Sequence, residues 1–311
     1  MSALDDTKFG AFHLEMEPAP FRKSWFLNAA SLFTVTPYPN GISLSEHNPP
    51  QTVQDIAQAQ LQRFDLRLPD TKHAALPQGT YSFYRENFRQ ALRHRLSKLE
   101  KNHTLLQSAW VLGLTSDPFL SAEKTGAIAA ATLEQFAAYP PGLLVVQTRS
   151  AKLLSSQEFL SLPRERVVVS VPIESCREES LSRYTTGQPT LKERLSLIER
   201  LRAEGFVVHV KVSPALPYGD FYRDAWKFAE LLVRHADYVS FADLCAFLGP
   251  NRGGSAIRQR LQIDRETRFL EPFSYRCVYY ALQSLAVQIL QLPTPFLPQA
   301  EQMILFPAQR R

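Results

Sequence analysis

The chain has 311 residues, of which 45% are hydrophobic and 21% are charged, and its formal net charge is +5. This is the composition of an ordinary globular protein, and it excludes a chain that is disordered throughout. Because no apolar run approaches the ~20 residues that a membrane-spanning helix needs, the sequence predicts no membrane span. The modest positive charge permits an anionic partner but does not require one.

The cysteines, Cys176, Cys245 and Cys277, lie far apart in the sequence. They form no CxxC pattern and no cluster with histidines, so the spacing indicates neither a zinc site nor an iron–sulfur site. The count is odd and sparse, and the N-terminus has no apolar signal segment. Together these features predict a reducing, cytoplasmic location.

The N-terminal third alternates short regular elements with proline-rich loops. A β-rich run predicts a strand over 31–35, and the prolines and glycine that follow predict a loop over 36–50. Apolar residues at helical spacing predict helices over 52–64 and over 84–99, the second of them amphipathic and rich in arginine.

From residue 108 onward, predicted strands and helices alternate. The strands cover 108–114, 142–147, 166–171, 206–212 and 238–241. The helices between them cover 122–139, 156–162, 190–204 and 220–235. The strands are continuously apolar, which is typical of a parallel sheet covered by helices. The pattern fits either an open doubly wound sheet or a complete or partial barrel.

The C-terminal part has a different pattern. Helices are predicted over 255–262 and 272–290, and three prolines then predict an extended tail. The predicted organisation is an irregular lead-in, a βα region, a C-terminal helical segment and a proline-rich tail. Their boundaries are 1–27, 28–248, 249–292 and 293–311.

Several predicted strands end in polar residues. Ligands of parallel α/β proteins bind at the carboxyl ends of the strands, so these residues predict a polar pocket for a zwitterionic or nucleotide-like ligand. Taken singly, most are also explained as helix caps or turn residues, and the histidine as a hydrogen-bonded core residue. The candidate ligand-binding residues are Thr115, Ser116, Asp117, Thr148, Arg149, Ser170, Glu174, His209, Lys211 and Ser213.

Four segments carry a family resemblance in a fixed order. They read LGLTSDPF at 112–119, VVQTRS at 145–150, VVSVPIES at 168–175 and VKVSPALP at 210–217. They resemble motifs of the radical S-adenosylmethionine (SAM) proteins close to spore photoproduct lyase, a branch that includes DNA repair photolyase-like proteins. The stretch 185–194 is similar to a further motif of that family.

The resemblance covers roughly residues 30–244 and implies a partial barrel, usually of six βα units. The predicted fold is therefore α/β, a partial (βα)6 TIM-like barrel with parallel strands and a C-terminal helical extension. The resemblance also implies contacts with SAM. Residues 115–117 would face its amino group, and Ser170, Glu174 and Lys211 would lie near its ribose or carboxylate, with Arg149 at a basic position beside them.

The family holds a [4Fe–4S] cluster through three cysteines, spaced CxxxCxxC, in the loop after the first strand. The resemblance aligns Gly41, Ser45 and Asn48 with those cysteines, and none of the three can supply a thiolate. The chain is therefore expected to lack the cluster and to be a degenerate member that does not perform radical SAM catalysis. The cluster iron also chelates SAM, so the resemblance leaves SAM binding open.

Four functional hypotheses follow. The first is a pseudoenzyme that binds a small ligand or a partner at the polar strand ends without radical chemistry. The second is an enzyme that uses Asp117, Glu174, His209 or Lys211 as acid–base groups. The third is a nucleic-acid-associated protein, for which a contiguous basic strip would be needed.

The fourth hypothesis is an interaction scaffold that docks a protein partner. The candidate docking elements are the proline-rich tail after residue 292 and the aromatic helix over 272–290. Exposed Tyr279 and Tyr280 would favour docking by the helix, whereas buried tyrosines would place that helix in the core.

Overall fold

The computed structural model describes residues 31–36, 61–65, 88–113, 117–120, 123–185, 188–212, 215–241 and 256–285. The chain forms two compact units. The described residues up to Ser170, with Ala203–Val207, belong to the first unit. Val171–Arg202 and the described residues from Val208 onward belong to the second unit. The division falls inside one strand, β5 (Val167–Pro172).

The first unit is built on parallel strands in the order β2-β1-β3-β4-β5. The strands preceding β5 are β1 (Ser31–Thr36), β2 (Leu61–Asp65), β3 (Ser108–Leu112) and β4 (Leu143–Gln147). Every residue of β3 and β5 is buried, as is all of β4 except its half-buried last residue, Gln147. Burial of successive residues explains why these strands are continuously apolar instead of alternating.

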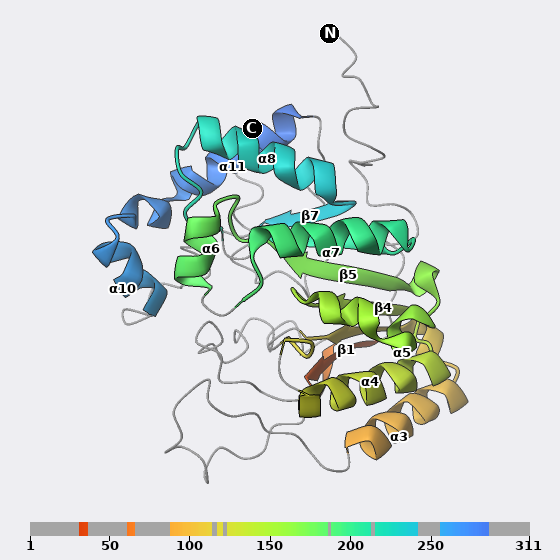
Figure 1. Cartoon of the computed structure of the whole chain (residues 1–311). Coiled ribbons are helices and arrows are strands. Elements are labelled where there is room, and N and C mark those ends of the chain that lie inside the picture. Colours follow the sequence, from red (N-terminus) through yellow and green to blue (C-terminus); the bar gives the residue numbers. More distant parts are fainter. Residues whose placement is uncertain are drawn as a thin grey trace, which may run out of the picture. The chain divides into compact units, whose positions relative to one another are not determined.

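Helices cover these strands. The helices of the first unit are α3 (Phe88–Lys101), α4 (Glu123–Ala138) and α5 (Gln157–Leu160), with 3-10 segments η3 (Leu105–Gln107), η4 (Ala151–Ser155) and η5 (Arg164–Arg166). Helix α4 packs against both α3 and α5, and the three lie side by side along the strands (Figure 1). Trp110 of β3 meets Phe136 of α4 edge to face at 5.5 Å between ring centroids, and both rings are fully buried.

The second unit continues the strand order with β6 (Val207–Val212) and β7 (Tyr238–Phe241), which are parallel. Its helices are α6 (Glu178–Tyr184), α7 (Leu191–Ala203), α8 (Arg223–His235), α10 (Ala256–Ile263) and α11 (Pro272–Ser284), with the 3-10 segment η6 (Thr267–Leu270). Helices α8 and α11 pack on each other (Figure 1). Tyr218 packs edge to face on Phe269 at 5.1 Å, and Phe228 lies beside it in the same core.

The strand order settles the fold class. From β3 to β5 in the first unit, and from β5 to β7 in the second, each strand is added next to the preceding one, always on the same side. With right-handed crossovers, such an order keeps the helices on one face, as in a barrel. The one reversal is at β1, which lies between β2 and β3. The predicted α/β fold with parallel strands is confirmed, and its order is consistent with a partial TIM-like barrel.

One predicted element needs correction. The prediction that residues 61–64 form the end of a helix is wrong, because they belong to β2 and pair with β1. Apolar residues three apart fit a helix, but pairing with a distant strand overrides that local signal. The helix predicted over 84–99 is confirmed from Phe88 onward, and residues 84–87 lie outside the described residues. Helix α6 was not predicted at all.

Some predictions lie outside the described residues. These are the lead-in 1–27, the loop over 37–50, the start of the helix predicted over 52–64 and the tail 293–311. The proposed domain boundaries stay predictions. Among the residues that are described, no helix is both long and apolar enough to cross a membrane.

Replacing Ser108 by alanine tests the core of the first unit. The Ser108 hydroxyl accepts a hydrogen bond from Trp110 Nε1 at 2.9 Å and donates one to the Leu105 carbonyl at 2.6 Å. Losing these buried contacts is expected to lower the free energy of unfolding by about 1–3 kcal/mol. Urea unfolding measures the change. Ser196→Ala, at an exposed position of α7, is the matched control, and an equal loss in both variants would contradict this account.

Candidate functional site

The structure describes seven of the ten candidate ligand-binding residues. Thr115, Ser116 and Ser213 lie outside the described residues, as do Gly41, Ser45 and Asn48. Four of the seven belong to the first unit, namely Asp117, Thr148, Arg149 and Ser170. The second unit holds the other three, Glu174, His209 and Lys211.

Asp117 is the centre of the cluster in the first unit. Its side chain is buried, and Oδ1 accepts hydrogen bonds from Thr148 Oγ1 at 2.8 Å and from the Phe119 amide at 3.0 Å. Oδ2 accepts from the Arg149 amide at 2.6 Å. Burial raises the pKa of Asp117 although these hydrogen bonds oppose the rise. The carboxylate therefore joins the loop after β3 to the loop after β4.

The neighbouring strand end joins the same cluster through the backbone. The Thr148 amide donates to the Ser170 carbonyl at 3.0 Å, and Thr148 Oγ1 also accepts from the Ser150 amide at 3.0 Å. The structure thus brings Asp117, Thr148, Arg149 and Ser170 together. Convergence of parallel strand ends, which predicted this grouping, explains it.

Glu174 lies two residues beyond β5 and forms a buried ion pair with Arg194 of α7. The distance from Arg194 Nη1 to Glu174 Oε2 is 2.5 Å, and the two side chains are 0% and 3% exposed. Arg194 also donates to the carbonyls of Pro172 at 3.0 Å and Pro189 at 2.8 Å, and to Thr185 Oγ1 at 3.2 Å. One guanidinium therefore holds the end of β5, the end of α6 and the start of α7.

Arg194 was missed as a site residue, although two sequence signals point to it. It lies on the buried face of α7 with Leu197, Ile198 and Leu201, where a charged residue needs a partner. Thr190 and Glu193 form a reciprocal capping box, with Glu193 Oε2 accepting from the Thr190 amide at 2.7 Å and Thr190 Oγ1 from the Glu193 amide at 3.2 Å. The cap fixes where the helix begins and thus which face carries the arginine.

The two candidates on β6 have different surroundings. His209 is buried between the buried Val208 and Val210. Lys211 is half-buried, and its carbonyl accepts a hydrogen bond from the Ile173 amide at 3.0 Å. This bond places Lys211 beside the segment that leads to Glu174.

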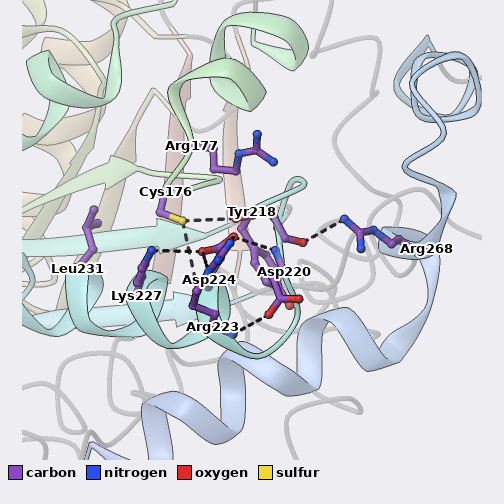
Figure 2. Close-up of a pocket in the computed structure, with 10 residues that line it drawn as sticks. Cys176, Arg177, Tyr218, Asp220, Arg223, Asp224, Lys227, Leu231 and Arg268 are labelled. Atoms are coloured by element: carbon purple, nitrogen blue, oxygen red, sulfur yellow. Dashed lines mark hydrogen bonds and ion pairs between the residues drawn. The ribbon is translucent and has the colours of Figure 1, made fainter.

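A pocket of about 730 Å³ opens in the second unit, in the loops beyond β5 and β6 (Figure 2). None of its lining residues was among the candidates. Four cations and two carboxylates line it, supplied by the segment before α6, by the start of α8 and by η6. They are Arg177, Asp220, Arg223, Asp224, Lys227 and Arg268.

Both carboxylates of the pocket have partners. Asp220 Oδ1 accepts from the amides of Tyr222 at 3.0 Å and Arg223 at 2.8 Å, and these bonds lower its pKa. Asp224 accepts from Arg223 Nε at 3.1 Å and lies 3.5 Å from Lys227 Nζ. The hydrogen bond with Arg223 is the main cause that lowers the pKa of Asp224 to about 2. Both groups are therefore ionised at neutral pH.

Cys176 and Tyr218 line this pocket with neutral side chains. Burial, and then the charge of Asp224, raises the pKa of the Cys176 thiol to about 11. The thiol is therefore protonated at neutral pH and is a poor nucleophile. The Tyr218 hydroxyl donates to the Ser274 carbonyl at 2.5 Å, and burial raises its pKa as well.

Gly219 shapes the turn between Tyr218 and Asp220. Its φ is +112°, in a region that side chains disfavour, and a Cβ at this position would overlap the carboxylate of Asp224. Its carbonyl accepts from Arg268 Nη2 at 3.2 Å. Only glycine allows the turn to approach Asp224 this closely.

The chain shows limited sequence and structural similarity to known proteins. No family model matches the chain. The uncharacterized protein ORF301 of Acidianus two-tailed virus is 23% identical over 197 residues, which cover 61% of this chain and 62% of that protein. The matched region thus spans less than two thirds of that relative's length.

Two solved structures are similar in part. A point mutant of spore photoproduct lyase aligns over 68% of this chain and 77% of its own, with 11% identity and a TM-score of 0.39. The carboxyl transferase domain of pyruvate carboxylase from Rhizobium etli aligns over 92% of this chain and 55% of its own, with 14% identity and a TM-score of 0.28. The structural similarity to a radical SAM enzyme is weak, and the fold class rests on the strand order instead.

Replacing Arg194 by methionine tests the buried ion pair. The change removes the cation that faces Glu174 in a site without water access, so the free energy of unfolding should fall by about 3–5 kcal/mol. The double variant Glu174→Leu/Arg194→Met removes both charges and should recover much of that loss in urea unfolding. Arg200→Met, at an exposed position of the same helix, is the control. A double variant no more stable than Arg194→Met would contradict the interpretation.

Replacing Asp117 by asparagine tests the buried carboxylate by its pH dependence. Because burial raises the pKa of Asp117 in the folded chain, the folded chain binds this proton more tightly than the unfolded chain. The contribution of Asp117 to the free energy of unfolding therefore falls as the pH rises between the two pKa values. Urea unfolding from about pH 4 to pH 7 should show the advantage of wild type over Asp117→Asn declining.

The control for this series is Glu165→Gln, which neutralises an exposed carboxylate of η5. It should keep the wild-type pH dependence. A difference between wild type and Asp117→Asn that grows with pH would show that the hydrogen bonds outweigh burial at Asp117.

Proposed function

We propose that this chain is a radical-SAM-like βα protein that has lost the ligands of the [4Fe–4S] cluster and binds a small polar ligand without radical chemistry. The observation that carries the binding role is the pocket of about 730 Å³ beyond the ends of β5 and β6. Its volume and its place at strand ends are typical of small-molecule sites in parallel α/β folds.

The sequence supports the loss of radical chemistry. Reductive cleavage of SAM needs an electron delivered through an iron that also chelates the amino and carboxylate groups of SAM. Gly41, Ser45 and Asn48 stand where the resembling family has its cluster cysteines, and none offers a thiolate. Cys176 lies instead in the pocket wall, as a neutral thiol.

In this proposal, the buried carboxylates position the strand-end loops and do not contact the ligand. Asp117 uses both oxygens in hydrogen bonds, and its residue is only 5% exposed. Glu174 is 2% exposed and is paired with Arg194. Because neither carboxylate is open to a substrate, the geometry favours a binding protein over an acid–base enzyme that uses these two groups.

Anaerobic reconstitution with iron and sulfide tests the loss of the cluster. The wild-type chain is expected to retain no stoichiometric iron and to show no charge-transfer absorbance of a cluster. The triple variant Gly41→Cys/Ser45→Cys/Asn48→Cys restores the CxxxCxxC spacing and serves as the matched control, since it should gain iron. A wild-type chain that holds a stoichiometric cluster would overturn the proposal.

A further inference from the structure

We propose that the pocket beyond the ends of β5 and β6 binds the phosphate group of a small, nucleotide-sized phosphomonoester, an inference that rests on the ligand-binding role proposed above. Four cations line the pocket, and they come from three segments of the second unit, with Arg223 and Lys227 both on α8. Figure 2 shows Arg223, Lys227 and Asp224 grouped on α8, with Arg177 and Arg268 extending from other segments. Among the residues that line the pocket, four cations face two carboxylates, and Glu179 and Glu266 outside the lining pair with Arg177 and Arg268.

The carboxylates do not make the pocket a cation site. Asp220 is occupied by two backbone amides at the start of α8, and Asp224 by the Asp220 amide, Arg223 and Lys227. Each carboxylate is therefore satisfied within the protein, and Asp224 also holds Arg223 and Lys227 in place. An incoming anion is attracted to the exposed cations, whereas a metal ion would have to displace Arg223 and Lys227 from Asp224.

The cations are accessible to a ligand. The side chains of Arg177, Arg223 and Lys227 are 43%, 71% and 62% exposed. Arg177 has a loose ion pair, 3.6 Å from a carboxylate of Glu179 that is itself 74% exposed. Exposed pairs of this kind contribute little, so Arg177 can turn toward a phosphate at small cost.

Arg268 is the best preorganised of the four cations. Its guanidinium lies over the rings of Phe221 and Phe269, at 5.1 Å and 5.2 Å from their centroids, and donates to the Gly219 carbonyl. Its Nε also donates to Glu266 Oε2 at 3.1 Å, and half of the side chain stays exposed. These contacts fix the guanidinium, and its Nη1 is the nitrogen that can meet a phosphate oxygen.

Two features favour a nucleotide over inorganic phosphate. A volume of about 730 Å³ is much larger than one phosphate group needs. Beside the lining residue Arg223, Tyr222 is 75% exposed and meets Phe273, which is 47% exposed, at 6.2 Å between ring centroids. Exposed aromatic rings next to phosphate-binding cations offer a stacking surface for a base.

Calorimetric titration with adenosine monophosphate tests the proposal. The wild-type chain should bind it saturably, with a Kd below about 1 mM, and adenosine should not bind measurably. Arg177→Ala and Lys227→Ala should each weaken binding roughly tenfold, because each removes one phosphate-facing charge. Added salt should weaken wild-type binding. Inorganic phosphate should bind more weakly than the nucleotide.

The matched controls are Arg200→Ala and Lys192→Ala, which remove the same charges from exposed positions of α7. They should bind like wild type. Thermal unfolding of all four variants checks that the fold is kept, and Arg177→Lys should restore part of the affinity lost in Arg177→Ala.

Several results would overturn the inference. If adenosine and its monophosphate bound equally well, the phosphate would not be the recognised group. If the lining and control variants lost the same affinity, the pocket would not be the binding site. Binding of a single-stranded oligonucleotide without measurable binding of the mononucleotide would overturn the small-ligand assignment. If the chain held no cluster and bound no nucleotide, this inference would be refuted and the proposed function would stand. A stoichiometric cluster would refute the proposed function.

Discussion

The buried ion pair between Arg194 and Glu174 is the interaction on which the strand-end loops of the second unit depend. Placing two charges out of contact with water is costly unless the remaining hydrogen-bonding capacity is also satisfied. Arg194 meets that condition through two carbonyls and the Thr185 hydroxyl. The Glu174 carbonyl accepts from the Leu216 amide at 2.8 Å, so the loop after β6 is tied to the same centre.

Residues next to the Arg194–Glu174 ion pair position the backbone of the pocket. The Ser175 hydroxyl donates to the Pro217 carbonyl at 2.8 Å and accepts from the Arg177 amide at 3.1 Å. The backbone of Arg177 is therefore fixed while its side chain remains exposed. A rigid backbone that carries exposed cations combines preorganisation with access, which is what binding of a charged ligand needs.

The sequence predicted what local patterns encode. Continuous apolar strands and helical periodicity predicted the parallel α/β fold, and convergence of strand ends predicted the contact of Asp117 with Thr148 and Arg149. The pairing of β2 with β1 was not predicted, because it depends on a distant strand. The lining of the pocket was missed for the same reason, whereas the buried face of α7 and its capping box are local signals for Arg194, the partner of Glu174. The residues that line the pocket come from separate segments, and no local spacing in the sequence indicates that they meet.

Gly219 makes the charge arrangement of the pocket depend on a position that has no side chain. Any substitution would push a Cβ into the Asp224 carboxylate, which would then release the two cations it holds on α8. The exposed cations themselves can be exchanged without disturbing the backbone. A change of charge at Arg177 or Lys227 therefore leaves the turn intact, whereas a side chain at position 219 would alter the turn and the charges on α8 together.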